Sequence, residues 1–450
     1  MSAEERRASR RGDGAVRHVI QSIFVTGGVI LVGLVSGVIA ARALGVDGRG
    51  ELAAVILWPA VLTSLAELGL PTAFTYLSAS RARTSRELAS SIVPLTIVQS
   101  LAIYVVGTPV VLLVLGGYST SVQQTAVGFL LAYAPLYLSV RYLMALNQGT
   151  GRIGVFNFAR LIIPSLYAAM LLGLLVASIV SVAAFAAAYA VSWLVALGGL
   201  LCVTSHEIRG GAFAPRIDLA TKRKAWSVGY RTYLGSLAPI DTLQLDVLLT
   251  TSFLGATAAG LYYVATSVGL LVRVWGTTLG ALSLPRVAAA AAIDKAQEWT
   301  TLFVRVTVVC SGAVALLALV FARPLLTLVY GGDYAAASLL VRILAVGMFA
   351  ASLRYVLGDG LRGLGQHAAA TRAEMVGWLV GGLALAVFLP LWGVTGVALA
   401  VSVSYGATLV AMLQFCRKLG MRSSRLLAPT RADLAKAREM VVSALRNSDR

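Results

Sequence analysis

Long apolar stretches, separated by short clusters of charged residues, glycine and proline, run along most of the chain. Each stretch is close to the roughly 20 residues that a helix needs to cross the hydrocarbon core of a bilayer. We place twelve spans near residues 19–41, 51–78, 88–115, 124–146, 155–177, 180–204, 226–251, 258–284, 300–330, 335–357, 373–390 and 393–416. The pattern predicts an all-α polytopic membrane protein with twelve transmembrane helices.

Composition excludes several other classes of protein. Of 450 residues, 58% are apolar and 12% are charged, whereas soluble domains carry about 25% charged residues. So few charges cannot cover a water-facing surface, which excludes a soluble enzyme and a nucleic-acid-binding domain. The cysteines Cys202, Cys310 and Cys416 are too widely spaced for a disulfide framework or a metal-binding motif. No nucleophile–base pair or nucleotide-binding loop is recognisable, so we predict no enzymatic activity and no cofactor.

The charges alternate from one side of the predicted membrane to the other. The chain has 37 Lys and Arg against 19 Asp and Glu, a net charge of +18. With twelve spans, 31 of the basic residues fall on the side of the two termini, and only Arg42, Arg49 and Arg323 fall on the opposite side. Because cytoplasmic loops carry the excess of Lys and Arg, we predict a multi-pass protein of the cell membrane with both termini cytoplasmic. The net charge then needs no nucleic-acid partner.

Three local patterns occur twice at nearly the same offset, each after an equivalent span. The pairs are Leu44–Gly50 with Leu254–Gly260, Leu115–Tyr118 with Tyr330–Tyr334, and Gly149–Gly151 with Gly363–Gly365, at offsets of 210, 215 and 214 residues. Glycine is common in this chain, but three pairs at one offset indicate an internal duplication. The sequence therefore predicts two halves of six spans each.

Because six is an even number, the two halves should have the same orientation and a pseudo-two-fold axis along the membrane normal. A central cleft between the two bundles is the expected site of transport. The predicted organisation is a basic cytoplasmic N-terminal arm, two six-helix bundles joined by a basic cytoplasmic linker, and a cytoplasmic tail that is partly helical. Their bounds are 1–18, 19–204, 205–225 for the linker, 226–416, and 417–450.

Several short motifs resemble the polysaccharide transporter branch of the multidrug/oligosaccharidyl-lipid/polysaccharide exporter superfamily. In the first half these are Ala41-Arg42-Ala43-Leu44-Gly45, Gly50-Glu51-Leu52-Ala53, and Leu68-Gly69-Leu70-Pro71 with Tyr76. In the second half they are Leu245-Asp246-Val247-Leu248-Leu249, Phe253-Leu254-Gly255, Gly260-Leu261-Tyr262 with Ala265, Leu284-Pro285-Arg286 and Tyr330-Gly331-Gly332. The resemblance covers about residues 18–416. It implies that helices one, two, seven and eight line the cleft.

The eighth span carries a polar stripe. At about 100° per residue, one helical face holds Tyr262, Thr266, Gly269, Arg273, Thr277 and Gly280. An arginine in mid-membrane is costly unless it faces a cavity or a partner, and its planar fork suits a phosphate or carboxylate. We predict that Arg273, Tyr262, Thr266 and Thr277 bind substrate. The alternative is that Arg273 only pairs with Asp241 or Asp246 of the seventh span.

Other charged residues lie inside the predicted spans. Arg141, Arg160, Arg231 and Arg354 lie one or two turns inside cytoplasmic span ends. They are either anchors whose side chains extend to the membrane surface or the lining of a basic vestibule for an anionic substrate. The acids Glu67, Asp241 and Asp246 are candidates for ion coupling or for buried packing partners.

We predict a flippase that moves a polyprenyl-diphosphate-linked oligosaccharide across the cytoplasmic membrane by alternating access. The expected surroundings are the lipid bilayer and glycosyltransferase or polymerase machinery. The diphosphate requires arginine in the cleft, the sugar suits hydroxyl-rich walls, and the lipid tail remains in the bilayer. One alternative is an ion-coupled multidrug or cation antiporter of the same superfamily, and another is a non-transporting scaffold of a glycan synthesis complex.

The predicted orientation can be tested by cysteine labelling from outside the cell. We expect an impermeant thiol reagent to modify a cysteine introduced at Ser119, between the third and fourth spans, but not one introduced at Ala220. Both variants should be labelled equally once the membrane is permeabilised. Labelling at residue 220 but not at residue 119 in intact cells would reverse the orientation.

Overall fold

The structure is a computed structural model that describes residues 3–79, 85–208 and 244–430. The chain divides into two compact units, residues 1–260 and residues 261–450. Within the described residues, helices are the only regular secondary structure. The predicted linker 205–225 lies almost wholly outside the described residues, and so do Arg231 and Asp241.

The described residues of the first unit contain seven helices and the start of an eighth. They are α1 (Ala3–Ala66), α2 (Leu70–Ala79), α3 (Ser85–Val114), α4 (Thr120–Gly149), α5 (Ile153–Val176), α6 (Val182–Ile208), α8 (Leu245–Phe253) and the first turns of α9 (Gly255–Ala288). The remainder of α9 belongs to the second unit. That unit continues with α10 (Ile293–Val329), the 3₁₀ turn η1 (Gly332–Ala337), α11 (Ser338–Gly363), α12 (His367–Lys418) and α13 (Ser423–Leu427).

Two helices each contain two predicted spans, joined at a glycine instead of a loop. Gly45 divides α1 with φ 69° and ψ −174°, and Gly393 divides α12 with φ 55° and ψ −132°. These positive φ angles suit a residue without Cβ. With α3 to α6 and α9 to α11, the two divided helices account for eleven predicted spans, and α8 supplies the described part of the seventh. The predicted all-α polytopic fold is confirmed.

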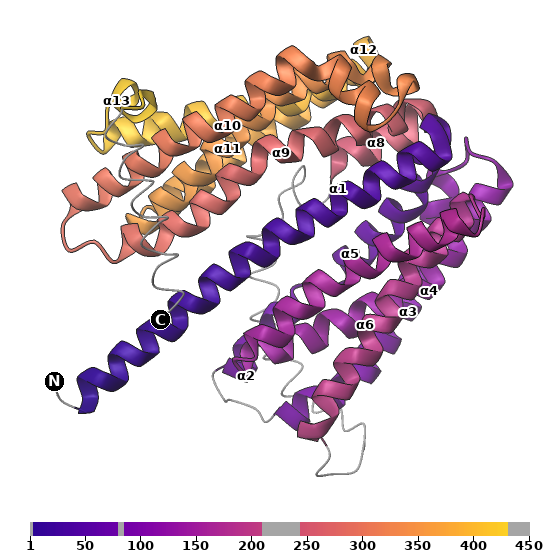
Figure 1. Ribbon diagram of the computed structural model, residues 1–450, viewed down its shortest axis with the longest axis horizontal. Helices are drawn as coiled ribbons and strands as arrows, with labels where there is room; N and C mark the ends of the chain where they lie inside the picture. The colour runs from indigo at the N-terminus through magenta and orange to yellow at the C-terminus, as the bar shows by residue number, and fades with distance from the viewer. Residues whose placement is uncertain (1–2, 80–84, 209–243, 431–450) are drawn as a thin grey trace. The chain divides into compact units, whose positions relative to one another are not determined.

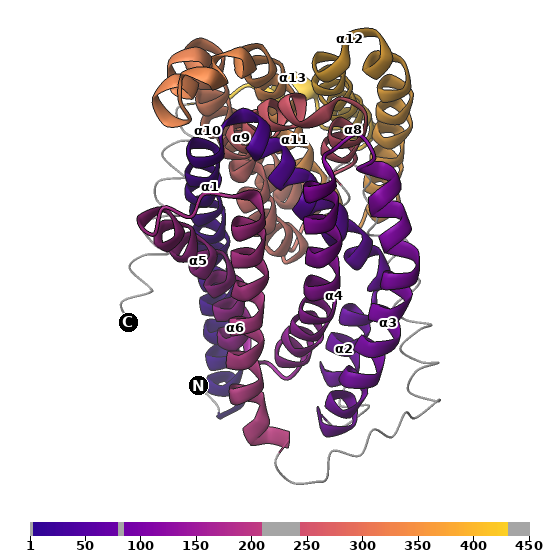
Figure 2. The same ribbon diagram turned by 90° about the vertical axis from the view of Figure 1, so that its right-hand side faces the viewer.

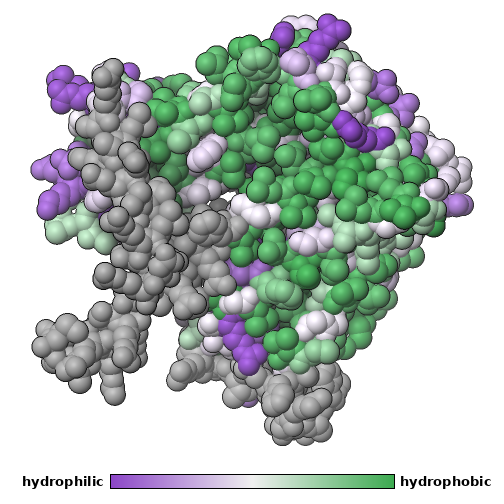
Figure 3. All heavy atoms as spheres, in the orientation of Figure 1, coloured by the Kyte–Doolittle hydropathy of each residue, from purple (hydrophilic) through white to green (hydrophobic). Residues whose placement is uncertain are grey.

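The surface of both units is unusually apolar. In Figure 3, hydrophobic side chains cover most of the visible face, and hydrophilic side chains gather toward its edges. Large apolar residues such as Leu113, Val176 and Leu383 are 82%, 88% and 70% exposed. Nine helices in the described part of the chain are long and apolar enough to cross a membrane. Apolar surface on this scale fits lipid and not water, so the protein is a multi-pass membrane protein.

Helix α4 forms the centre of the first unit. It packs against α1, α2, α3, α5 and α6, and Figure 2 shows it between α3 and α6. Its fully buried residues include Leu130, Leu138 and Tyr142. A polar side chain on the inner face of α4 therefore has neighbours on several other helices.

In the second unit, α11 packs between α10 and α12, and the three helices lie side by side in Figure 1. A glycine seam on α9 also faces α11. A methyl group at Gly276 would overlap the backbone of Ser352, and one at Gly280 would meet the carboxylate of Asp359. The hydroxyls of Ser311 and Ser352 both donate to the carbonyl oxygen of Val272 at 3.0 Å. Small residues of this kind let membrane helices approach closely.

Two of the three sequence repeats have the same backbone structure. Gly45 and Gly255 have similar positive φ angles of 69° and 79°. Gly151 and Gly365, at φ 82° and 76°, end α4 and α11 with the same turn, in which the next N–H donates five residues back at 2.8 Å. In the third pair, Gly331 has φ 114° whereas Gly116 has no positive φ. In two of the three pairs, the repeated sequences therefore share a glycine with positive φ at the equivalent position.

The first repeated pair also makes a reciprocal contact inside the first unit. A methyl group at Gly50 would overlap the carbonyl of Ala256, and one at Gly260 would overlap the carbonyl of Val46. Because Ala256 and Gly260 follow Val46 and Gly50 by 210 residues, the two segments contact each other through equivalent positions. The hydroxyl of Thr257 donates to the carboxylate of Asp47, which is also 210 residues away. Reciprocity of this kind is the local signature of a two-fold relation between these segments.

We expect Gly50→Ala to lower the free energy of unfolding by about 1–3 kcal/mol, because the added methyl cannot fit against Ala256. The matched control is Gly128→Ala in α4, where a methyl has no neighbour within 4 Å and alanine favours the helix. Thermal unfolding of the two purified variants in detergent measures the difference. Equal melting temperatures would show that the close contact is absent.

Candidate functional site

The second predicted span is interrupted by a three-residue break. Helix α1 ends at Ala66 and α2 begins at Leu70. Between them, Leu68 has φ 49° and Gly69 has φ 74°. Two successive residues with positive φ end an α-helix, and Pro71 then suits the first turn of α2, where its missing N–H is not needed. The eighth span, which occupies the equivalent place in the second half, continues through α9 without such a break.

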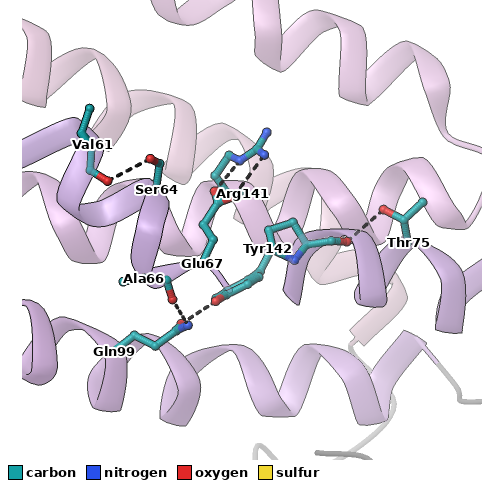
Figure 4. A network of polar contacts seen from close by, with 9 residues as sticks. Val61, Ser64, Ala66, Glu67, Thr75, Gln99, Arg141 and Tyr142 are labelled. Carbon is teal, nitrogen blue, oxygen red and sulfur yellow. Dashed lines mark hydrogen bonds and ion pairs between the residues drawn. The ribbon is translucent and has the colours of Figure 1, made fainter. Parts of the chain in front are cut away.

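Glu67 lies in this break and forms a two-point ion pair with Arg141 of α4. The Arg141 Nε donates to Glu67 Oε1 at 2.7 Å, and its Nη2 donates to Oε2 at 3.4 Å (Figure 4). The guanidinium also lies 5.9 Å from the centre of the Tyr137 ring. The Glu67 side chain is 10% exposed, whereas that of Arg141 is 38% exposed. The carboxylate is therefore enclosed, whereas the Arg141 side chain remains partly accessible.

The backbone at the break is also held by polar side chains. The Gln99 amide donates to the carbonyl of Ala66 at 2.6 Å, and the Tyr142 hydroxyl donates to the Gln99 amide oxygen (Figure 4). On the α2 side, the Thr75 hydroxyl donates to the carbonyl of Ala145 in α4 at 3.3 Å. A carbonyl at a broken helix end in hydrocarbon needs such a partner. Helix α4 thus contacts both sides of the break through consecutive turns.

Arg160 of α5 is a second cation in the first unit. Its Nη2 donates to the hydroxyl of Thr26 in α1 at 3.1 Å, and its guanidinium lies 5.7 Å from the centre of the Phe156 ring. The side chain is half-buried and close enough to Arg141 for the two charges to interact. Two partly open guanidinium groups on adjacent helices can attract one anionic group between them.

Arg354 of α11 lies in a different environment, although Leu-Arg-Tyr in α11 resembles Val-Arg-Tyr around Arg141. It is paired with Glu374 of α12 and lies 4.7 Å and 5.1 Å from the ring centres of Tyr355 and Tyr405. Only 4% of its side chain is exposed. In this conformation the charge of Arg354 is neutralised inside the unit and the side chain does not extend to the surface. Its role as a substrate ligand stays a prediction.

The glycines in the polar stripe of α9 pack against α11. Gly269 lies against Met348, and Gly280 lies against Tyr355 and Asp359. Tyr262 is fully buried at 0% exposure. The role of Tyr262 as a substrate ligand stays a prediction.

The other residues of the stripe are half-buried. Thr266 and Thr277 donate to the carbonyls of Tyr263 and Val274 in their own helix, at 2.9 Å and 3.0 Å. Arg273 lies between them on α9 and stays a predicted substrate ligand. Asp246 is buried in the first turn of α8, at 6% exposure.

The pairing of Glu67 with Arg141 was not predicted from the sequence. Both residues were recognised as charged groups within spans, but 74 positions separate them. The nearest sequence signal is Leu68-Gly69-Leu70-Pro71, which contains the residues of the break. A helix end at this motif would have placed Glu67 outside the helix, facing the neighbouring spans.

The polytopic helical fold is shared with solved structures of membrane transporters. No family model matches the chain, and no curated protein matches its sequence. Among solved structures, the lipid II flippase MurJ in an inward closed conformation superposes with a TM-score of 0.72 at 14% identity, over 88% of this chain and 87% of that one.

Two other solved structures have the same fold. An inward-facing multidrug resistance MATE family transporter of the MOP superfamily gives a TM-score of 0.68 at 15% identity, over 87% of this chain and 94% of its own. A MOP superfamily transporter from Pyrococcus furiosus, whose reverse polarity of binding pocket suggests a different function, gives a TM-score of 0.58 at 14% identity. The match covers 91% of this chain and 96% of that one. At such identities these structures establish the fold and leave the substrate to the residues of the site.

The two ion pairs should respond differently to loss of the acid. Glu374→Gln leaves the enclosed Arg354 without its carboxylate, which should cost about 3–5 kcal/mol of unfolding free energy. Glu67→Gln leaves Arg141 open to water or lipid headgroups and should cost about 1 kcal/mol or less. Thermal unfolding of both variants in one detergent compares the losses. Equal losses would contradict the difference in exposure of the two arginines.

Proposed function

We propose that this protein is a membrane flippase that moves a polyprenyl-diphosphate-linked oligosaccharide to the outer leaflet for cell-surface polysaccharide assembly. The observation that supports this most strongly is a pair of half-buried arginines in the first unit: Arg141, which contacts Glu67 at the break in the second span, and Arg160 of the adjacent helix α5. A guanidinium offers two parallel N–H donors to phosphate oxygens, and it stays charged inside a membrane protein.

The fold is compatible with this chemistry. The structures that share it include a lipid II flippase. In our proposal the diphosphate binds the arginines, the glycan occupies the central cleft predicted from the sequence, and the polyprenyl chain stays in the bilayer. The two bundles then alternate between conformations open to either side of the membrane. The cytoplasmic termini and the cytoplasmic location of the linker belong to the same proposal.

Multidrug efflux is the second candidate, because MATE transporters also share the fold. A cationic drug requires an available carboxylate in its binding site. In the described part of the first unit, the enclosed acid Glu67 is already engaged by Arg141, and the open side of this pair belongs to the cation. The electrostatics at this site therefore favour an anionic substrate over a cationic drug.

We expect Arg141→Ala to reduce translocation of a fluorescent polyprenyl-diphosphate-linked glycan in proteoliposomes by at least about tenfold, since a lost charge-assisted contact of 1.5–3 kcal/mol corresponds to roughly that factor. Arg141→Lys should retain part of the activity, because it keeps the charge without the fork. The double variant Arg141→Ala/Glu67→Gln, which leaves no unpaired acid, controls for stability. Arg372→Ala, at an exposed position of α12, controls for the loss of a charge.

The same assay tests Arg273. If Arg273 binds the diphosphate, Arg273→Ala should abolish translocation at normal protein abundance. If Arg273 instead neutralises Asp241 or Asp246, abundance should fall as well, and Asn at the paired aspartate should restore it. Normal translocation by well-folded Arg141→Ala and Arg273→Ala variants, together with efflux of a cationic dye, would replace the flippase by the drug transporter.

A further inference from the structure

We propose that the Glu67 carboxylate is a built-in anion that occupies the phosphate-binding fork of Arg141 until the substrate displaces it. The inference rests on the proposed flippase function and specifies how its anion site is regulated. It concerns one exchange: an internal carboxylate on Arg141 is replaced by a phosphate of the lipid-linked diphosphate. No covalent bond is made or broken.

The contact geometry supports this exchange. Nε and Nη2 of Arg141 are both directed at Glu67, one to each carboxylate oxygen, at 2.7 Å and 3.4 Å. This is the side of the guanidinium that also binds two oxygens of a phosphate. A bound phosphate would therefore use the same donors, and the two anions exclude each other.

Exposure distinguishes this pair from a purely structural one. The second unit contains the same chemical pair, Arg354 with Glu374, and there the arginine is 4% exposed and stacked close to two tyrosine rings. Arg141 is 38% exposed, while its partner Glu67 is 10% exposed. A ligand can therefore approach Arg141 but not Arg354. The second unit supplies a natural control in which the acid cannot be displaced.

The position of Glu67 gives the exchange a structural consequence. Glu67 is the first residue of the break between α1 and α2, where Leu68 and Gly69 have positive φ. The adjacent carbonyl of Ala66 is held separately by Gln99, and Thr75 of α2 is held by α4. When the carboxylate leaves Arg141, the three-residue joint loses one of its connections to α4 while the flanking helices keep theirs. Occupation of the anion site thus acts on the interrupted second span.

An internal competitor weakens the apparent affinity for the external anion, because only the fraction of molecules with a vacant fork can bind. Glu67→Gln keeps the size of the side chain and removes its charge. We therefore expect Glu67→Gln to bind a polyprenyl diphosphate roughly tenfold more tightly than the unmodified protein. Translocation should fall at the same time, because the tighter complex has lost the group that returns Arg141 to its resting partner.

The experiment is a titration of the full chain in lipid nanodiscs, read by native mass spectrometry. The probes are undecaprenyl diphosphate and undecaprenol, which has the same tail without the charge. The variants are Glu67→Gln, Arg141→Ala, the combination of the two, and Glu374→Gln as the matched acid-to-amide control. Because Glu374→Gln is expected to be less stable, Glu374→Asp, which retains the charge, is measured beside it.

We expect Glu67→Gln to bind the diphosphate more tightly than the unmodified protein does. The Glu374 variants should show no increase in affinity, and the increase caused by Glu67→Gln should be lost in Glu67→Gln/Arg141→Ala. If the unmodified protein binds the diphosphate in preference to undecaprenol but Glu67→Gln binds it equally or more weakly, the displaced-anion inference is overturned and the flippase proposal stands. If no variant prefers the diphosphate to undecaprenol, both the inference and the proposed function fail.

Discussion

The cost of holding an ionised group away from water is the constraint on which this structure depends. Hydrocarbon offers no hydrogen bonds, so each charge within a span must find a partner on another helix. In the first unit this requirement places Glu67 against Arg141 and thereby connects the break in the second span to the central helix α4. In the second unit it places Arg354 against Glu374 and joins α11 to α12. Both units thus contain a Glu–Arg ion pair, which is partly exposed in the first unit and enclosed in the second.

Breaks in the backbone are satisfied by the same rule. The end of α1 in mid-span has its last carbonyl bound by Gln99, which is positioned by Tyr142. Arg141, which forms the ion pair, and Tyr142, which positions Gln99 at the break, are therefore consecutive residues of α4. A substrate that competes for Arg141 acts on a helix joint whose other connections are independent of charge. This separation allows the ion pair to exchange without unfolding the joint.

The internal duplication explains which features are shared by the halves and which are particular to one. The repeated glycines at 45 and 255 both have positive φ, and Gly50 and Gly260 allow reciprocal backbone contact between the repeated segments. These are features of chain geometry that any duplicated bundle requires. The break at Glu67 has no equivalent in α9, where glycines pack against α11 instead. The departure from the repeat coincides with the candidate anion site, which is where a function-specific feature is expected.

The sequence by itself determined the spans, the duplication and the membrane class, because each depends on local hydrophobicity, chain length and the conformational preference of glycine. Gly45, for example, lies between the first two predicted spans, and Gly393 begins the twelfth, so both lie at boundaries that the apolar pattern predicts. Which charged residues form ion pairs with each other could not be predicted from these local properties. Whether Arg141 meets Glu67, and whether Arg354 is open or enclosed, depends on which helices pack together and on how closely their rings surround the charge. Only the tertiary structure decides this, since residues 74 positions apart are brought within 2.7 Å by the packing of α1 against α4.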